Sequence, residues 1–127
     1  MPEKHLFEYA VIRVVPRVER EEFLNIGVVL YCARQKFLST MFVLDEERLR
    51  AFPACPDTRE LTEFLNAFAK ICKGGEGAGP IGRLTLPERF RWLTATRSTI
   101  LQTSKVHPGF CADAGAMLEK LYFQLVL

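Results

Sequence analysis

The 127-residue chain has little of what metal centres require. It holds only two histidines, His5 and His107. No Cys-x-x-Cys pair occurs among its four cysteines, Cys32, Cys55, Cys72 and Cys111. Protein zinc sites combine several such ligands at short spacing. The sequence therefore predicts no metal site, with His107 as a surface residue in a turn and the cysteines as reduced thiols.

Long apolar runs and a surplus of charge are also absent. The longest uncharged apolar run, residues 26–33, is far shorter than the ~20 residues that cross a bilayer, and the N-terminal sequence MPEKHLFEYAV lacks the features of a signal peptide. The chain has 17 basic and 15 acidic residues, so its net charge is +2. Nucleic-acid-binding domains usually have a marked basic excess. We therefore expect a cytoplasmic protein with no membrane attachment, and we place nucleic acid last among its partners.

Motifs of nucleotide and acyl chemistry are missing or misplaced. Residues 77–82 match Gly-x-Gly-x-x-Gly, but a dinucleotide site needs this motif between a strand and a helix N-terminus. Here it follows a predicted helix, and Pro80 removes one backbone N–H, so we interpret residues 73–82 as a helix stop and a flexible loop. No Walker motif and no Gly-x-Ser-x-Gly elbow occurs. The sequence predicts no cofactor and no catalytic residue, and it leaves open whether the protein is an enzyme.

The residues that are present predict an α+β fold. Apolar residues make up 49% and charged residues 25% of the chain, as in globular proteins. Residues 7–15, 26–33, 37–44 and 97–105 have the β-branched composition of strands. The short link 34–36 favours an antiparallel hairpin of the second and third strands. We expect the fourth strand to pair beside the first, and Pro108 and Gly109 to break the chain after it.

Helices are predicted after Asp45, over residues 57–72, over residues 87–93 and after Asp113, each aspartate acting as an N-cap. Asp57 and Glu60 have the spacing of a capping box. The helix at 57–72 has an apolar stripe that we expect to be buried, formed by Leu61, Phe64, Leu65, Phe68, Ile71 and Cys72. The pattern predicts a single α+β domain over residues 1–127, with a mainly antiparallel sheet of about four strands packed with helices.

Polar side chains on otherwise apolar strands are the candidates for a ligand site. Arg13 lies among apolar neighbours, and the last predicted strand carries Arg97 and Gln102. If the two strands are adjacent, these three side chains converge only with a bulge, because residues five apart point to opposite faces of a regular strand. Guanidinium groups on a rigid sheet suit phosphate or carboxylate recognition. The alternative is that Arg13 pairs with a nearby acidic residue, the usual fate of a partly buried charge.

Two segments carry a family likeness, YAVIRVVPRVEREEFLNIGVVLYC at residues 9–32 and RFRWLTATRSTILQTSKVHPG at residues 89–109. They resemble the small bacterial family known as domain of unknown function 3037. The resemblance implies no particular activity, cofactor or catalytic residue. It does imply a protein partner, because members of the family occur beside kinase-like proteins of the HipA type.

Three functions remain in competition. The favoured one is a non-catalytic protein-interaction or accessory module, with a HipA-like kinase or a second copy as partner, and we expect Tyr122, Phe123 and Val126 to be partly available for it. The second is a binding domain or enzyme for an anionic or phosphate ligand, using the strand arginines. Nucleic-acid binding is the least favoured, and its candidate contacts are Arg17, Arg20, Arg34 and Lys36.

Overall fold

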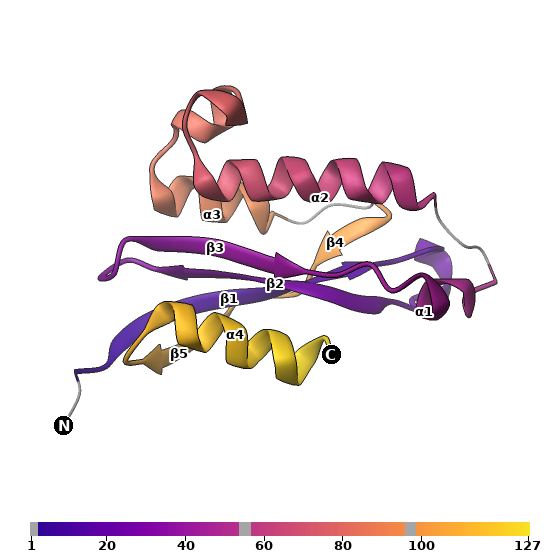
Figure 1. The fold of residues 1–127 in the computed structure, drawn as a ribbon, viewed down its shortest axis with the longest axis horizontal. Coiled ribbons are helices and arrows are strands. Elements are labelled where there is room, and N and C mark those ends of the chain that lie inside the picture. Colours follow the sequence, from indigo (N-terminus) through magenta and orange to yellow (C-terminus); the bar gives the residue numbers. More distant parts are fainter. Residues whose placement is uncertain (1–2, 54–56, 96–98) are drawn as a thin grey trace.

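The computed structural model describes residues 3–53, 57–95 and 99–127, and within them five strands form one antiparallel sheet with helices on both faces (Figure 1). β1 (His5–Val14), β2 (Leu24–Cys32) and β3 (Phe37–Phe42) lie side by side in the order β3-β2-β1. The predicted hairpin of β2 and β3 is confirmed. The α+β class with a mainly antiparallel sheet is likewise confirmed.

The second edge of β1 is shared by two short strands. β4 (Leu101–Thr103) pairs with residues 12–14 of β1, and β5 (His107–Cys111) pairs with residues 5–9. Between the two, Ser104 stays in contact with Val11, since its backbone N–H donates to the Val11 carbonyl at 2.8 Å and its hydroxyl accepts from the Val11 N–H at 2.8 Å. The predicted pairing of the fourth strand with the first is confirmed.

β5 corrects the prediction that Pro108 and Gly109 break the chain. Both residues lie inside this strand, opposite Glu8 and Phe7 of β1. Proline is tolerated in an edge strand, where a missing N–H need not break the ladder. A Cβ at Gly109 would lie 2.5 Å from the Phe7 ring, so the glycine allows that ring to cover β5. The strand therefore depends on its contact with β1 more than on its own β propensity.

The described residues form four α-helices, α1 (Glu46–Arg50), α2 (Thr58–Lys73), α3 (Leu86–Leu93) and α4 (Ala114–Leu125). Asp45, Asp57 and Asp113 cap α1, α2 and α4 as predicted, each accepting from backbone N–H groups. Thr85 and Glu88 form a complete capping box at the N-terminus of α3. Three 3₁₀ turns, Val18–Arg20, Glu76–Ala78 and Pro80–Arg83, complete the helical segments.

The loop at 73–82 does stop α2. Gly74 ends the helix with φ 76°, a left-handed backbone conformation that favours glycine, and its N–H donates to the Lys70 carbonyl. The chain then folds into two of the 3₁₀ turns. The glycine-rich motif thus lies between two helices and does not follow a strand, as a dinucleotide site requires.

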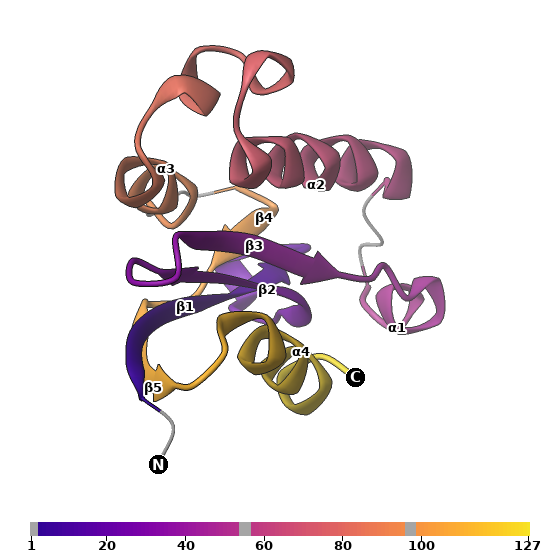
Figure 2. The same ribbon diagram turned by 60° about the vertical axis from the view of Figure 1, so that its left-hand side comes forward.

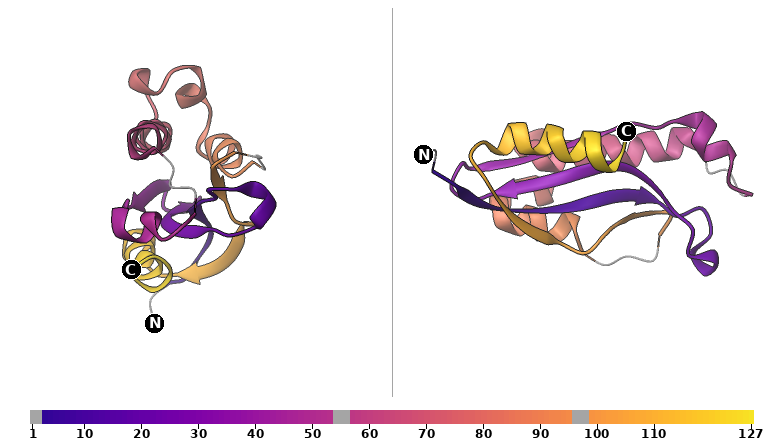
Figure 3. Two further views of the ribbon diagram at one scale, coloured as in Figure 1. Left: turned by 90° about the vertical axis from the view of Figure 1, so that its right-hand side faces the viewer. Right: turned by 90° about the horizontal axis from the view of Figure 1, so that it is seen from below.

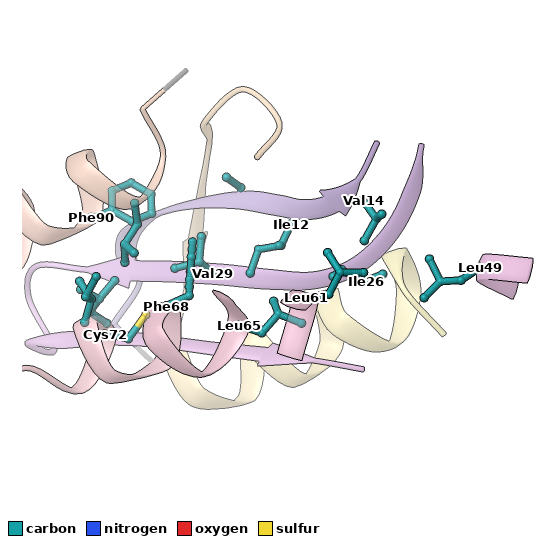
Figure 4. Close-up of a cluster of buried hydrophobic side chains, with 14 residues drawn as sticks. Ile12, Val14, Ile26, Val29, Leu49, Leu61, Leu65, Phe68, Cys72 and Phe90 are labelled. Carbon is teal, nitrogen blue, oxygen red and sulfur yellow. The ribbon is translucent and has the colours of Figure 1, made fainter. Parts of the chain in front are cut away.

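Helices cover the two faces of the sheet separately, with α2 and α3 on one side and α4 on the other (Figures 1 and 2). Figure 4 shows the core beneath α2, where side chains of the helix meet side chains of β1 and β2. The members of that core include Ile12, Val14, Ile26, Val29, Leu61, Leu65 and Phe68. A second core under α4 includes Phe7, Val28, Leu30, Cys32, Ala114 and Leu118. Each large aliphatic side chain that is fully buried contributes roughly 1.5–3 kcal/mol.

The apolar stripe of α2 is wider than the sheet covers. Five of its six predicted members are buried. Phe64 is the exception, because 54% of it is exposed. It lies one turn from Leu61 and one turn from Phe68, at the edge of the stripe, and the expectation that it is buried was wrong.

Replacing Leu65 by alanine should lower the free energy of unfolding by about 2–5 kcal/mol, since Leu65 is fully buried and a cavity adds to the lost transfer energy. Replacing its neighbour Phe64 by alanine removes a larger side chain but should lower it by about 1 kcal/mol or less. Urea unfolding of both variants measures the difference. Equal losses would contradict the orientation of α2.

Candidate functional site

Arg13 stands in the middle of three polar side chains that cross the sheet. It is directly opposite Asn25 on β2 and Gln102 on β4, and opposed residues on antiparallel strands share a face. We call Asn25, Arg13 and Gln102 the polar row. The Nδ2 of Asn25 donates to the Leu125 carbonyl at 3.2 Å, which places the row on the face of α4. β1 and β5 lie to one side of α4 in the view from below (Figure 3).

A bulge does occur beside Arg13. Ile12 pairs with Gly27 and Arg13 pairs with Asn25, so Ile26 is one residue more than β1 can oppose. Bulges of this kind re-aim neighbouring side chains. Of the three residues predicted to converge, Arg13 and Gln102 are brought together, while Arg97 lies outside the described residues.

The guanidinium of Arg13 rests on an aromatic ring. Its central carbon is 4.3 Å from the centroid of Phe23, a cation–π contact of about 0.5–1 kcal/mol at an exposed site. Within residues 3–53, 57–95 and 99–127, no carboxylate lies within ion-pairing distance of Arg13, and its Nε is buried without a hydrogen-bond partner. The alternative of an acidic partner for Arg13 is therefore not realised in the described part of the chain.

The opposite face of the sheet has a groove between α2 on one side and the end of α3 and residues 99–101 on the other. Its volume is about 500 Å³, within the ~300–1,000 Å³ typical of ligand pockets. We call it the apolar groove. Its lining residues come from α2, α3 and residues 99–101, with Asp57 at the N-cap of α2, and they are Asp57, Glu60, Leu61, Phe64, Ala67, Phe68, Ile71, Trp92, Leu93, Thr99, Ile100 and Leu101.

Three large apolar side chains of the apolar groove are exposed. The exposed fraction is 54% for Phe64, 40% for Trp92 and 41% for Ile100. Exposed apolar side chains scattered singly are normal, but a contiguous patch marks an interaction surface. Sequence reasoning missed this feature. The signal in the sequence was the width of the α2 stripe. Leu61, Phe64 and Leu65 occupy more of the helix surface than a single line of side chains facing the sheet would.

Arg89 holds one end of the groove together. This residue is 8% exposed, and its Nη1 donates to the carbonyls of Ile71 at 2.8 Å and Cys72 at 2.9 Å. Its Nε donates to the Leu84 carbonyl at 3.1 Å. The last carbonyls of a helix have no partners inside the helix, so Arg89 satisfies the end of α2 and fixes α3 beside it. No periodicity in the sequence distinguishes such an arginine from the exposed Arg91 two residues later.

Replacing Arg89 by lysine should lower the free energy of unfolding by about 1.5–3 kcal/mol, because one ammonium group cannot reproduce the guanidinium's fixed fork of donors. Arg91→Lys, on the exposed side of the same helix, is the matched control and should change stability by less than about 0.5 kcal/mol. Urea unfolding measures both. Similar values for the two variants would show that the three carbonyl contacts do not stabilise the fold.

The described cysteines Cys32, Cys72 and Cys111 are free and buried. Burial raises the pKa of Cys72 to about 12, although the nearby Arg89 guanidinium acts in the opposite direction. The pKa of Cys111 is also raised, by burial and by the adjacent Cys32. Thiols with raised pKa values stay protonated and unreactive near neutral pH. Cys55 lies outside the described residues.

The basic residues considered for nucleic acid lie at two ends of the sheet. Arg17 and Arg20 follow β1, and Arg20 pairs with Glu22. Arg34 and Lys36 lie in the turn between β2 and β3 at the other end, and Arg34 pairs with Glu3 at 3.3 Å. These four residues do not form one patch.

Two further findings concern the described parts of the chain only. They contain no group of three or more His, Cys, Asp and Glu side chains placed to hold a metal ion. None of their helices has the length and apolar character needed to cross a bilayer.

Of the C-terminal side chains expected to be available to a partner, Phe123 is 70% exposed and Tyr122 is half-buried, but Val126 is buried, so that expectation was wrong for Val126.

Fold and surfaces together define an α+β protein with helices on both faces of an antiparallel sheet, an apolar groove on one face and a polar row on the other. The chain belongs to the family described as protein of unknown function (DUF3037), whose profile matches residues 9–126. This confirms the resemblance carried by residues 9–32 and 89–109. Searches of the curated proteins and of the solved structures found no match.

Proposed function

We propose that this protein is a non-catalytic interaction module that binds another protein through the apolar groove. The observation that carries the proposal is the exposure of Phe64, Trp92 and Ile100 around one concave surface. Aromatic residues are enriched in interfaces and dominate their binding energy when they fill a desolvated pocket. A partner that fills the groove removes all three side chains from water.

The proposed partner is a HipA-like kinase of a bacterial cytoplasm, and the proposed unit is the single domain of residues 1–127. The partner is suggested by the family resemblance. The free thiols of Cys32, Cys72 and Cys111 fit a reducing compartment. The single unit is supported by the sheet, since β1 and β2 contribute side chains to both cores.

Phe64 is the best position at which to test the groove, because it is exposed and stands apart from the core. A buried aromatic anchor at an interface typically contributes at least ~2 kcal/mol. Phe64→Ala should therefore weaken binding of a co-expressed HipA-like kinase from the same genome by about tenfold or more. Biolayer interferometry with purified proteins measures the dissociation constants.

Phe123→Ala is the matched control, because Phe123 is 70% exposed on α4, across the sheet from the groove. It should change the affinity by less than about twofold, as most peripheral interface residues do. Loss of binding in Phe123→Ala alone would move the interface to α4. The absence of any complex with the wild-type chain, or equal affinities for all three proteins, would refute the proposed function.

The polar row supports a second candidate, recognition of an anion or phosphate group. The specific observation is that Arg13 has no carboxylate partner in the described residues and has Gln102 beside it. Arg97 is part of this candidate as well. A guanidinium without an internal counter-ion is suited to bind a phosphate or carboxylate from outside.

Inorganic phosphate and nucleotides at about ten times their dissociation constant should raise the melting temperature by a few degrees, since ligand that binds only the folded state stabilises it. The rise should disappear in Arg13→Ala and persist in Arg17→Ala, an exposed arginine outside the row. Differential scanning fluorimetry measures all three proteins. A shift of equal size in Arg13→Ala would exclude the polar row as the anion site.

A further inference from the structure

We infer that the partner segment that fills the apolar groove is an amphipathic helix, antiparallel to α2, with lysine or arginine in its last turn beside Asp57 and Glu60. This inference rests on the proposed function and adds the secondary structure, direction and charge of the partner. Three features of the groove lead to it: the spacing of its lining residues, the state of the neighbouring backbone and the position of its charges.

The lining of the groove follows α2 for most of its length. Its residues on α2 recur at intervals of three and four from Asp57 to Ile71, a distance of about 21 Å at 1.5 Å per residue. Trp92 and Ile100 face this line from the other side of the groove. A trough along one helix accepts a second helix whose apolar residues repeat with the same spacing.

The backbone carbonyls of residues 99–101 beside the groove are not free to pair with a partner strand. The Thr99 hydroxyl donates to the Leu101 carbonyl at 2.6 Å, and the Gln102 Nε2 donates to the Thr99 carbonyl at 2.8 Å. The Ile100 carbonyl accepts from the Val15 N–H at 2.6 Å. A partner strand needs free backbone groups at a sheet edge. These three carbonyls are already occupied, so this side of the groove offers side chains to its occupant.

The charge of the groove is confined to one end and has one sign. Asp57 and Glu60 are its only charged lining residues among those described, and neither takes part in an ion pair with a described residue. Both lie at the N-terminal end of α2. Basic side chains are most favourable in the last turn of a helix, where the macrodipole is negative. A helix antiparallel to α2 brings such a turn next to Asp57 and Glu60.

A displayed library of 16-residue helix-forming peptides tests the inference. Each peptide has leucine or phenylalanine along one face at helical spacing, and the polar positions of both end turns vary among lysine, glutamate and glutamine. Selection is run on the wild-type protein, on Phe64→Ala, on Glu60→Lys and on Glu63→Lys. Glu63 is the matched control, because it is exposed on the same helix and does not line the groove.

We expect the wild type to enrich peptides with lysine in the C-terminal turn and not in the N-terminal turn. The best of these peptides, measured by fluorescence anisotropy, should bind Glu60→Lys roughly fivefold to tenfold more weakly and Glu63→Lys within about twofold. Glu60→Lys should enrich glutamate in the C-terminal turn. Phe64→Ala should not enrich the wild-type peptides.

The inference is overturned if no helix is enriched, if lysine is not preferred at the C-terminal end, or if Glu63→Lys has the same effect as Glu60→Lys. Enrichment of the same peptides on Phe64→Ala also overturns it. These outcomes are separable from a failure of the proposed function. A partner that loses affinity for Phe64→Ala, together with a library that shows no preference for lysine, refutes the inferred direction and charge of the helix and leaves the interaction module in place.

Discussion

The pairing of β1 on both of its edges is the constraint on which the rest of the structure depends. β2 occupies one edge, and β4 and β5 share the other. β1 also contributes to both cores, through Ala10, Ile12 and Val14 on the face of α2 and through Phe7 on the face of α4. A strand that is paired on both edges and contributes side chains to both cores fixes the register of its neighbours. The polar row and the groove are therefore both positioned by this strand.

The two faces use their helices differently. α4 packs on β2 and β3. The part of the sheet that contains Arg13 and Gln102 lies beside α4 and not beneath it. On the other face, α2 and α3 are joined by the Arg89 contacts, which keep the two helices at a set separation. Leu61 and Leu65 of α2 are buried in the core, whereas Phe64 is exposed and lines the groove. The apolar groove and the polar row thus lie on opposite sides of the same sheet.

Burial decides the chemistry of the polar groups as well. Arg89 is desolvated but satisfied by carbonyls at the negative end of α2, the arrangement that a helix terminus favours for a cation. Arg13 is less buried and contacts an aromatic ring, with no ion-pair partner among the described residues. The same residue type therefore stabilises the fold at one position and is the candidate anion ligand at the other.

The sequence by itself determined most of the elements: the strands other than β5 from their β-branched runs, the α2 stripe from its helical spacing, and the aspartate caps from their side-chain chemistry, because all of these are local properties. Tertiary structure alone decided what depends on contacts between distant segments. β5 forms despite Pro108 and Gly109 because β1 offers it an edge to pair with and the Phe7 ring covers Gly109. Phe64 is exposed because it lines the groove between α2 and residues 99–101, and Phe23 lies against the Arg13 guanidinium because the fold brings these two residues together. Local patterns state which side chains are apolar or charged, but only the folded chain states which of them face one another.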